Sequence, residues 1–494
     1  MTDMAPQPDL ATATTPSRGR DVDVSQQSAL PRPDGTFVPA VMSIMTVLIV
    51  LVIGIRPVMD VDAWWHLKAG EFVLNGGAFF GPDTWVPFAT RPFVLTQWLP
   101  EVIAFKGYEW FGLPAVAWLR VVSILLILSA ILWCTRRVAD AVPALIAALA
   151  ALVGTGGSLS ERPQLVSFIL LAVWVGASWR TAEDLRPRWW LIPVTWVWAS
   201  SHGMWITGIG VGVIVICGLL LDRRIDLRQA GRLMLVPLAS LAVVALTPVG
   251  PRLLLTPFEV AGNATSFIQE WQPTNVRGGV FAIVTMTLLV GVVVGWFHSS
   301  SVPPWWQIGL AAVAFVATLA MSRTIPVGAI ISAPLAASVL QGLRGSAPLP
   351  LPRRSVRRWG GLIAFAALIA IPVTAQVASK PGLTPEGLRQ SLSDIPAGSV
   401  VLDDFAVSGW LLWAEPDLVP VIDLRSEIYS KEYFQAYRNA EQVRAGWQTY
   451  IELVKPGYAL IRKDAPLRLA LQEELHWKTV KQDSSSVYVL LKAP

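Results

Sequence analysis

The sequence carries little charge for its length. Only 15% of its 494 residues are charged, whereas 53% are hydrophobic and 23 are tryptophan. Soluble globular chains carry charge on roughly a quarter of their residues, so this composition predicts a polytopic protein surrounded by membrane lipids. The formal charge of +5 does not indicate a nucleic-acid partner, because the basic residues fall in short loops between apolar runs.

Cysteine and histidine are also scarce. The two cysteines, Cys134 and Cys217, both lie inside apolar segments, and the four histidines are too few for a histidine-rich metal site. This excludes a disulfide framework and a cysteine-based metal cluster. Both cysteines are expected to be buried packing residues.

Residues 1–36 lack a hydrophobic core and are rich in Pro, Ser, Thr, Gln and Asp. This composition is typical of a disordered tail. The first apolar run begins near Phe37, too far along the chain and too long for a cleaved signal peptide, and so it is expected to remain as a membrane helix.

Long apolar runs dominate residues 37–377. A membrane-spanning helix needs about 20 mostly apolar residues, and on this criterion the region is a mainly α-helical membrane domain with about eleven spans. They are predicted near 37–55, 113–134, 138–156, 163–179, 189–203, 204–221, 233–248, 278–297, 304–322, 325–342 and 359–377. Between the first two spans lies an outer loop, 56–112, in which residues 98–112 are predicted to form a partial or re-entrant helix.

Most Lys and Arg residues of the connecting loops fall on the side of the N-terminus, which the positive-inside rule assigns to the cytoplasm. An odd number of spans then places the C-terminus outside. We therefore expect a multi-pass protein of the cytoplasmic (inner) membrane with a cytoplasmic tail and an extracytoplasmic C-terminal domain.

The last part of the chain, residues 378–494, differs in composition. It is richer in charge, and strand-like runs such as "SVVLDD" and "YALIRK" alternate with helix-like stretches at 431–453 and 466–476. This alternation favours a small α/β domain with a mainly parallel sheet.

Unusual polar residues occur in five outer-side motifs. Ionisable groups at membrane depth are costly and usually mark function or a paired structure, so these motifs predict a polar cavity on the outer face, lined by candidate catalytic and substrate-binding residues. They are Asp60, Asp62 and His66 in and after "DVD", Arg162 in "SERPQ", His202 in "SSHG", Glu270 in "IQEW" and Arg323 in "SRTIP".

The first motif also has structural interpretations. Asp62 precedes a helix-like stretch that stops at Gly76 and is a candidate N-cap, whereas Asp60 has no such explanation. Asp62 and His66, four residues apart, would share a helix face, as a hydrogen-bonded pair or as metal ligands. The neighbouring tryptophans, Trp64 and Trp65, are more typical of interfacial anchors than of sugar-stacking platforms.

Structural alternatives remain open for the other motifs as well. Glu161 and Arg162 are candidates for a loop ion pair, and His202 for a packing histidine. Glu270 and Arg323 are candidates for an intramembrane pair. In the last domain, the "DLRSE" segment with Asp423, Arg425 and Glu427 is interpreted as a domain-internal ion pair, with glycan binding as the alternative.

A cavity of this kind suits group transfer from a phosphate-activated lipid. A carboxylate can act as the general base on an acceptor hydroxyl, and arginines can bind the leaving phosphate. A carboxylate also stabilises an oxocarbenium-like transition state. Alternatively, Asp60 and Asp62 could together hold a divalent cation, Mg or Mn.

The stretch "DVDAWWHLKAGEFVLNGGAFFGPDTW", followed by "QWLPEVIAF", resembles the first outer loop of a family of bacterial membrane proteins within the GT-C superfamily of glycosyltransferases. The likeness continues in "ERPQLVSFILL", "WASSHGMWITG", "FIQEW", "SRTIPVGAIISAPL" and "VIDLRSEIY". It implies a GT-C architecture, a polyprenyl-phosphate-sugar donor and a reaction outside the cytoplasmic membrane. By this resemblance the catalytic base or metal ligand falls on Asp60 and Asp62.

The sequence departs from the family pattern at three places. Ser200 and Ser201 precede the His-Gly motif where Asn is usual, Thr247 stands where Asn is common, and Gln97 replaces an acidic residue. These departures affect the expected substrate contacts more than the expected fold.

The sequence therefore predicts an integral-membrane glycosyltransferase that moves a sugar to a cell-envelope glycan, lipid or protein. A transporter or flippase of a lipid-linked substrate is the first alternative, but its polar residues would follow a path across the membrane. The second alternative is a non-catalytic envelope scaffold, in which Asp60 and Asp62 would be dispensable.

Overall fold

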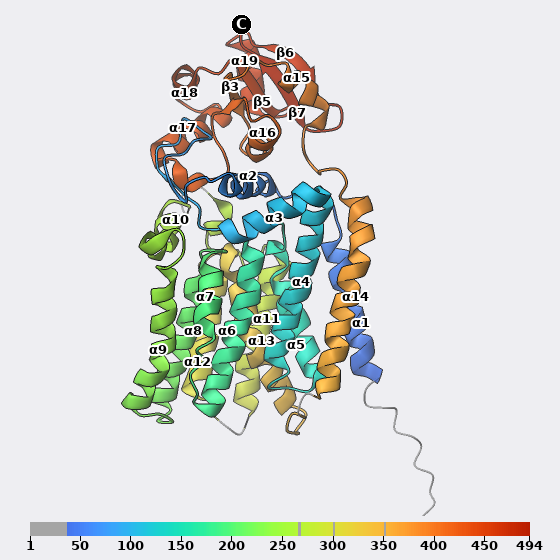
Figure 1. Cartoon of the computed structure of the whole chain (residues 1–494), viewed down its shortest axis with the longest axis vertical. Helices are drawn as coiled ribbons and strands as arrows, with labels where there is room; N and C mark the ends of the chain where they lie inside the picture. Colours follow the sequence, from blue (N-terminus) through green and yellow to red (C-terminus); the bar gives the residue numbers. More distant parts are fainter. Residues whose placement is uncertain (1–36, 265–267, 300–301, 350–351) are drawn as a thin grey trace, which may run out of the picture.

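A computed structural model describes residues 37–264, 268–299, 302–349 and 352–494 of the chain. It shows a bundle of helices beneath a C-terminal α/β domain, with the first helix starting at the end of the bundle far from that domain (Figure 1). The tail predicted at residues 1–36 lies outside the described residues.

Every predicted span contains a helix. The bundle helices are α1 (Phe37–Gly54), α4 (Leu113–Thr135), α5 (Ala141–Gly154), α6 (Gln164–Asp184), α7 (Leu191–Ala199), α8 (Trp205–Leu221), α9 (Leu227–Val244), α11 (Val280–His298), α12 (Trp305–Ala320), α13 (Ile325–Gly342) and α14 (Arg353–Val377). Among the described residues, seven helices are long and apolar enough to cross a membrane, and α5, α8 and α12 are apolar but shorter. The helix α7 has only 9 residues, so the count of eleven spans stays a prediction.

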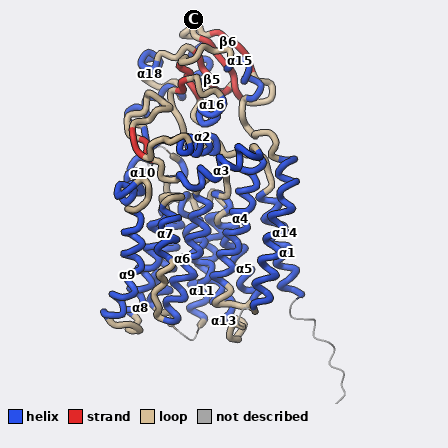
Figure 2. The backbone as a smooth tube through the Cα atoms, in the orientation of Figure 1, coloured by secondary structure: helices blue, strands red, loops and turns tan. Residues whose placement is uncertain are grey.

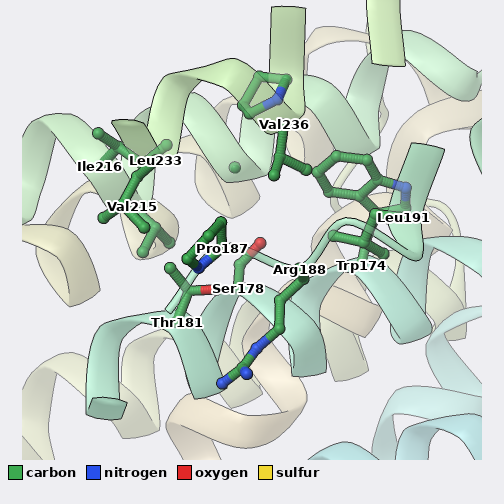
Figure 3. Close-up of a pocket in the computed structure, with 12 residues that line it drawn as sticks. Trp174, Ser178, Thr181, Pro187, Arg188, Leu191, Val215, Ile216, Leu233 and Val236 are labelled. Carbon is green, nitrogen blue, oxygen red and sulfur yellow. The ribbon is translucent and has the colours of Figure 1, made fainter. Parts of the chain in front are cut away.

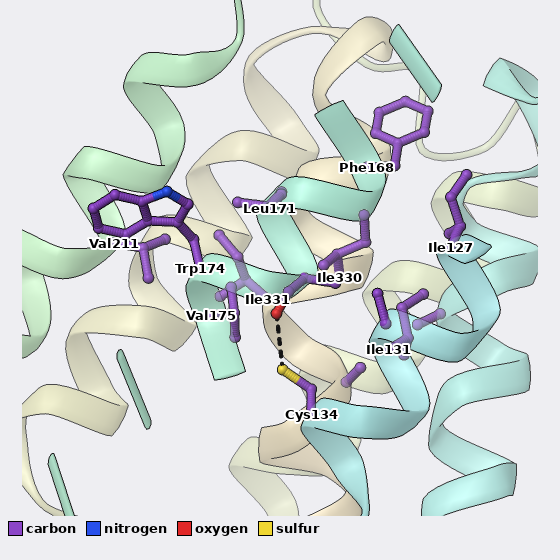
Figure 4. Close-up of a cluster of buried hydrophobic side chains, with 14 of the residues drawn as sticks. Ile127, Ile131, Cys134, Phe168, Leu171, Trp174, Val175, Val211, Ile330 and Ile331 are labelled. Atoms are coloured by element: carbon purple, nitrogen blue, oxygen red, sulfur yellow. Dashed lines mark hydrogen bonds between the residues drawn. The ribbon is translucent and has the colours of Figure 1, made fainter. Parts of the chain in front are cut away.

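The centre of the bundle is a large apolar cluster contributed by α4, α6, α8 and α13 (Figure 4). Cys134 lies in this cluster, and its thiol donates to the carbonyl oxygen of Ala172 over 3.1 Å. Cys217, however, is exposed on α8, so its predicted burial is wrong. A lipid-facing position is as apolar as a core position, and sequence alone does not distinguish the two.

The first loop, 56–112, forms its own layer between the bundle and the C-terminal domain (Figure 1). It contains α2 (Ala63–Leu74), α3 (Trp98–Phe111) and a short antiparallel pair, β1 (Phe80–Gly81) with β2 (Phe93–Val94). The segment predicted as a partial or re-entrant helix is α3, which lies across the end of the bundle. Gly70 lets α2 lie directly on the α3 backbone, because a Cβ there would collide with the carbonyl of Glu101.

Short helices connect the longer elements. They are α10 (Thr256–Ala264) and the 3-10 turns η1 (Gly156–Ser158), η2 (Gly250–Leu254), η3 (Gln269–Trp271), η4 (Ser322–Thr324), η5 (Glu386–Leu388) and η6 (Ser426–Ile428). Several of these turns lie at the end of the bundle that faces the C-terminal domain.

The C-terminal domain is built on a five-stranded sheet, drawn in red at the top of Figure 2. Its strands are β3 (Val400–Asp403), β4 (Val419–Pro420), β5 (Tyr458–Arg462), β6 (Lys478–Gln482) and β7 (Tyr488–Lys492), and its helices are α15 (Arg389–Ser393), α16 (Ser408–Ala414), α17 (Lys431–Glu441), α18 (Trp447–Val454) and α19 (Pro466–Glu473). The order is β4-β3-β5-β7-β6. The first three strands are parallel, and β7 is antiparallel to both of its neighbours. The sheet is thus mixed rather than mainly parallel, because the short β6–β7 connection permits only a hairpin.

The C-terminal domain and the first loop share buried apolar clusters. Trp65 packs with residues of the sheet, and Trp64 packs with Trp410 and its neighbours on α16. Gly409 of α16 allows this close approach, since a Cβ there would stand 2.9 Å from the carbonyl oxygen of Val61. Trp64 and Trp65 are each only 6% exposed. They are therefore neither interfacial anchors nor open stacking platforms, because the C-terminal domain covers them.

Candidate active site

Arg162 brings the two aspartates of the first loop together. Its Nε donates to Asp60 Oδ2 over 2.7 Å, and its Nη1 lies 3.0 Å from Asp62 Oδ2. The aspartates follow the end of α1, and Arg162 stands in the turn before α6. Residues about 100 positions apart in the sequence thus form one ion-paired cluster at the end of the bundle below the C-terminal domain.

Both aspartates also organise the start of α2. Asp60 Oδ1 accepts a hydrogen bond from the Asp62 backbone N–H over 2.9 Å, and Asp62 Oδ1 accepts one from Trp65 Nε1 over 3.0 Å. Asp62 occupies the N-cap position, but its side chain makes no capping hydrogen bond to the helix backbone. The capping interpretation of Asp62 is therefore wrong, because the carboxylate is directed to the Arg162 guanidinium and the indole.

Burial and charge shift the two aspartates in opposite directions. Burial alone would raise the pKa of Asp60, but the Arg162 guanidinium outweighs it and the net pKa of Asp60 is lowered. Burial raises the pKa of Asp62, and the nearby charge of Asp60 adds to this effect despite the opposing charge of Arg162. Paired carboxylates whose pKa values are pushed apart are typical of sites where each has its own role.

Glu270 extends the cluster to a second arginine. Its Oε2 accepts a hydrogen bond from Arg323 Nη1 over 3.1 Å, and its Oε1 lies 3.5 Å from Arg162 Nη1. The Arg323 guanidinium also lies over the Trp271 ring, 5.4 Å from the ring centroid. The pair anticipated between Glu270 and Arg323 is therefore present, and it joins the Arg162 cluster through Glu270.

The two histidines have other partners. His66 Nδ1 lies 2.8 Å from Glu101 Oε1 of α3, and both side chains are buried. The Asp62–His66 hydrogen bond anticipated from their spacing is not formed, because the Asp62 carboxylate contacts Arg162 and Trp65. A metal site at these two residues stays a prediction. Burial raises the pKa of Glu101 even though His66 partly offsets the shift. The pair holds α2 on α3.

His202 contacts the interior of the bundle. The backbone N–H of Met204 donates to His202 Nδ1 over 3.4 Å, so Nδ1 is the acceptor and the Ser167 hydroxyl, 2.9 Å away, donates to it as well. Ser167 in turn accepts from Trp198 Nε1 over 2.7 Å. The contacts of Nδ1 are those expected of a histidine that packs inside the bundle. A contact between the substrate and the other ring nitrogen, Nε2, stays a prediction.

An open pocket adjoins the cluster. Its volume is about 320 Å³, and its lining residues are Arg56, Met59, Asp60, Val61, Ser160 and Arg162. A second pocket lies near the opposite end of α6, lined by Ser178, Thr181 and Arg188 among others (Figure 3). That pocket measures about 20 Å³, which is room for a water molecule and no larger ligand. The pocket beside Asp60 is therefore the candidate site.

Two buried ion pairs, Arg120–Glu161 and Arg425–Asp83, are not among the contacts predicted from the sequence. Glu161 pairs with Arg120 of α4 rather than with Arg162, so the loop ion pair predicted between Glu161 and Arg162 is wrong. The lone arginine inside the apolar run "WLRVVSILL" was a signal for this contact, since a charge within a span needs a partner. Arg425 binds Asp423 as anticipated, but it also binds Asp83 of the first loop over 2.6 Å. Asp83 and Arg425 are 342 positions apart in the sequence, and no local pattern indicates that contact.

The Asp60 and Asp62 carboxylates, the candidate metal ligands of the first loop, both contact the Arg162 guanidinium. Within the part of the chain that the structure describes, no group of three His, Cys, Asp or Glu side chains could hold a metal ion. Mg and Mn are usually held by several oxygen ligands, so a metal-binding role of Asp60 and Asp62 stays a prediction.

By sequence, the chain matches no protein-family model and no curated protein. By fold, it is similar to the archaeal oligosaccharyltransferase AglB from Archaeoglobus fulgidus in complex with an inhibitory peptide and a dolichol-phosphate. The TM-score is 0.58 at 13% identity, over 86% of this chain and 69% of AglB. The apo oligosaccharyltransferase of A. fulgidus gives 0.56 at 12% identity, over 88% and 70%.

A third structure, the A. fulgidus oligosaccharyltransferase in complex with Zn and sulfate, gives a TM-score of 0.53 at 14% identity, over 87% of this chain and 68% of that one. At such low identity these likenesses concern the fold alone. The chain therefore has the overall fold of these archaeal oligosaccharyltransferase structures, in line with the GT-C architecture that the resemblance of its motifs implies.

Proposed function

We propose that the protein is an integral-membrane glycosyltransferase that moves a sugar from a polyprenyl-phosphate donor to a glycan, lipid or protein of the cell envelope. The observation that carries this proposal is the contact of Arg162 with Asp60 and Asp62 beside an open pocket in a GT-C fold. A carboxylate and a guanidinium side by side are the two groups that glycosyl transfer from a phosphate requires.

Asp60 is the residue proposed to meet the reacting atoms, because it lines the pocket and its lowered pKa keeps it ionised. The acceptor oxygen attacks the anomeric carbon, and the bond from that carbon to the phosphate oxygen breaks. The phosphate leaves with the bonding electron pair, and Asp60 takes the proton of the acceptor hydroxyl. Its charge also stabilises the oxocarbenium-like transition state. Asp62 is proposed to orient Arg162.

Two arginines line the pocket and are proposed to bind the donor phosphate. Arg162 is one, and the other is Arg56, whose buried Nε has no hydrogen-bond partner in the described structure. An unused N–H of a charged group is costly when buried, and a phosphate oxygen would satisfy it. The dolichol-phosphate bound to AglB supports a lipid-phosphate donor for this chain. His66, His202, Glu270 and Arg323 remain proposed substrate-binding residues around this centre.

The proposed setting is the cytoplasmic (inner) membrane, with the reaction and the C-terminal domain on the outer face. The first helix begins at the opposite end of the bundle from that domain, which supports an odd number of crossings (Figure 1). A divalent cation stays a prediction. Removal of metal with EDTA, followed by addition of Mg²⁺ or Mn²⁺, would show whether transfer depends on one.

The test uses membranes that contain the full chain and a panel of polyprenyl-phosphate sugars labelled in the sugar. Transfer to envelope glycan and release of label to water are measured for Asp60→Asn and Asp62→Asn separately. Asp184→Asn is the matched control, because Asp184 also pairs with an arginine, Arg188, but at the far end of α6. Asp60→Asn is expected to lower transfer about 100-fold or more. Full activity in both aspartate variants would contradict the catalytic proposal.

A further inference from the structure

Arg120 is a charged residue buried inside the apolar helix α4, with 1% of its surface exposed. Its guanidinium donates to three backbone carbonyl oxygens where α1 ends and the first loop begins. Nε donates to Gly54 over 2.9 Å, Nη2 to Arg56 over 2.6 Å and Nη1 to Pro57 over 3.3 Å. These carbonyls immediately precede Asp60. Arg120 therefore fixes the direction in which the chain leaves the membrane towards the site.

The same guanidinium forms an ion pair with Glu161, whose side chain is also buried. Glu161 is the residue before Arg162, so this contact fixes the second segment of the site. A further bond joins the two segments, because Arg56 Nη2 donates to the carbonyl oxygen of Leu159 over 3.1 Å. The segment that carries Asp60 and the segment that carries Arg162 are thus cross-linked behind the pocket.

Stability alone is a poor explanation for this pair. Burying two charges is costly, and apolar side chains of similar volume often stabilise a protein as well or better. What an arginine fork provides and an apolar side chain does not is a fixed geometry for several acceptors. The geometry at stake is the 2.7 Å contact of Arg162 with Asp60, and an error of about 1 Å in such a contact can cost about 100-fold in rate.

We infer that Arg120, through its contacts with residues 54–57 and Glu161, is a positioning residue that sets Asp60 and Arg162 at their working distance. This inference rests on the proposed transfer reaction. The positioning role differs from the transfer reaction because Arg120 touches no substrate. Its guanidinium does not line the pocket, and its N–H groups are bound to protein partners.

The chain offers a matched control for this pair. Arg137, at the other end of α4, binds Glu183 near the end of α6 over 2.6 Å. Arg120 in α4 pairs with Glu161 in the turn before α6, whereas Arg137, just after α4, pairs with Glu183 in the last turn of α6. The Arg137–Glu183 pair is partly exposed and lies far from the pocket. Its loss should leave the geometry of the site unchanged.

The experiment compares Arg120→Lys, the double variant Arg120→Met/Glu161→Gln and the control Arg137→Met/Glu183→Gln as full chains in membranes. The measurements are thermal unfolding, transfer per folded protein and the pH profile of transfer. Both Arg120 variants are expected to transfer about 100-fold more slowly per folded protein, while the control matches wild type. A purely structural role would change the amount of folded protein and leave the rate per folded molecule unchanged.

The pH profile reports on the site itself. The charged groups around Asp60 are Arg162, Asp62, Arg56 and Arg120, and of these Arg162 holds the pKa of Asp60 low. When Arg162 is displaced, the acid limb of the profile should move to higher pH, whereas loss of folded protein would scale the whole profile without moving it.

The outcomes separate the two proposals. If wild type transfers sugar and either folded Arg120 variant matches its rate and profile, the positioning role is overturned while the transfer reaction stands. If neither Arg120 variant folds, Arg120 serves stability and the inference is overturned as well. If wild type transfers no sugar from any donor in the panel, the proposed function fails first.

Discussion

Two of the arginine–carboxylate centres, those of Arg425 and Arg162, differ in what covers them. Arg425 is fully buried, binds Asp83 and Asp423, and lies over two neighbouring aromatic rings, 4.2 Å from the Trp85 centroid and 4.5 Å from that of Phe93. Arg162 contacts three carboxylates, but its side chain is 20% exposed and forms part of a pocket wall.

This difference shows which centre can meet a substrate. The aromatic rings and two carboxylates enclose Arg425, and together they join the C-terminal domain to the first loop. The Arg162 centre keeps one side open and shifts the pKa values of its two aspartates apart. Similar residue types thus form a structural joint in one place and a candidate reaction centre in the other.

The largest expected effect comes from opening the closed centre. Arg425→Met leaves Asp83 and Asp423 buried without their partner, and breaking a buried pair in this way costs about 3–5 kcal/mol. The unfolding temperature should fall steeply, and limited proteolysis should cleave the first loop. Arg462→Met is the control, because Arg462 pairs with Asp464 on the exposed surface. Equal unfolding temperatures for Arg425→Met and wild type would refute the structural assignment.

Substitution of Arg162, in the open centre, should lower the rate of sugar transfer rather than the stability of the fold. Arg162→Lys keeps the charge but loses the fork that contacts both aspartates, and transfer should fall about 100-fold. The unfolding temperature should change little, because the site is open to water on one side. A variant with normal transfer and lowered stability would reverse the comparison between Arg162 and Arg425.

The aspartates should differ in how their loss affects stability. The pKa of Asp60 is lowered, so its ionised form stabilises the fold above its unfolded pKa, and this contribution is lost as pH falls through the folded pKa. The pKa of Asp62 is raised, so the fold favours its neutral form and its ionised form costs stability at neutral pH. At pH 7 the free energy of unfolding should therefore be smaller for Asp60→Asn than for Asp62→Asn. The difference between the two variants should become smaller at acid pH. The opposite order would show that Arg162 does not favour Asp60.

Glu270 should give the smallest effect. Its side chain is 47% exposed, and exposed ion pairs contribute about 1 kcal/mol or less. Glu270→Gln should slow transfer by at most about fivefold, and added salt should mask the difference. A loss as large as that of Arg162→Lys would place Glu270 among the reacting groups.

Much of the fold could be predicted from the sequence because its physical signals are local. Runs of apolar residues long enough for a bilayer mark the helices of the bundle, and alternating strand-like and helix-like stretches mark the C-terminal domain. The motif around Asp60 indicates a candidate site because charge beside a span is rare. The prediction of a mainly parallel sheet is wrong at β7, which is antiparallel to both neighbours, since a strand's direction depends on its connection rather than on its composition.

The contacts of the site were less predictable. Asp62 precedes a helix, yet its side chain turns to Arg162, a residue about 100 positions away. His66 has the spacing of a partner for Asp62, yet it faces Glu101 on another helix. Trp64 and Trp65 have the composition of interfacial anchors, but a domain more than 300 residues further along the chain covers them. Each of these depends on tertiary packing that no local pattern carries.

The most direct test of the central claim is an experimental structure of the full chain in a lipid nanodisc with a polyprenyl-phosphate sugar bound. The account predicts that the donor phosphate lies within hydrogen-bonding distance of Arg162 or Arg56, with the anomeric carbon of the sugar facing Asp60. A donor bound elsewhere, with the pocket beside Asp60 filled only by water, would contradict it.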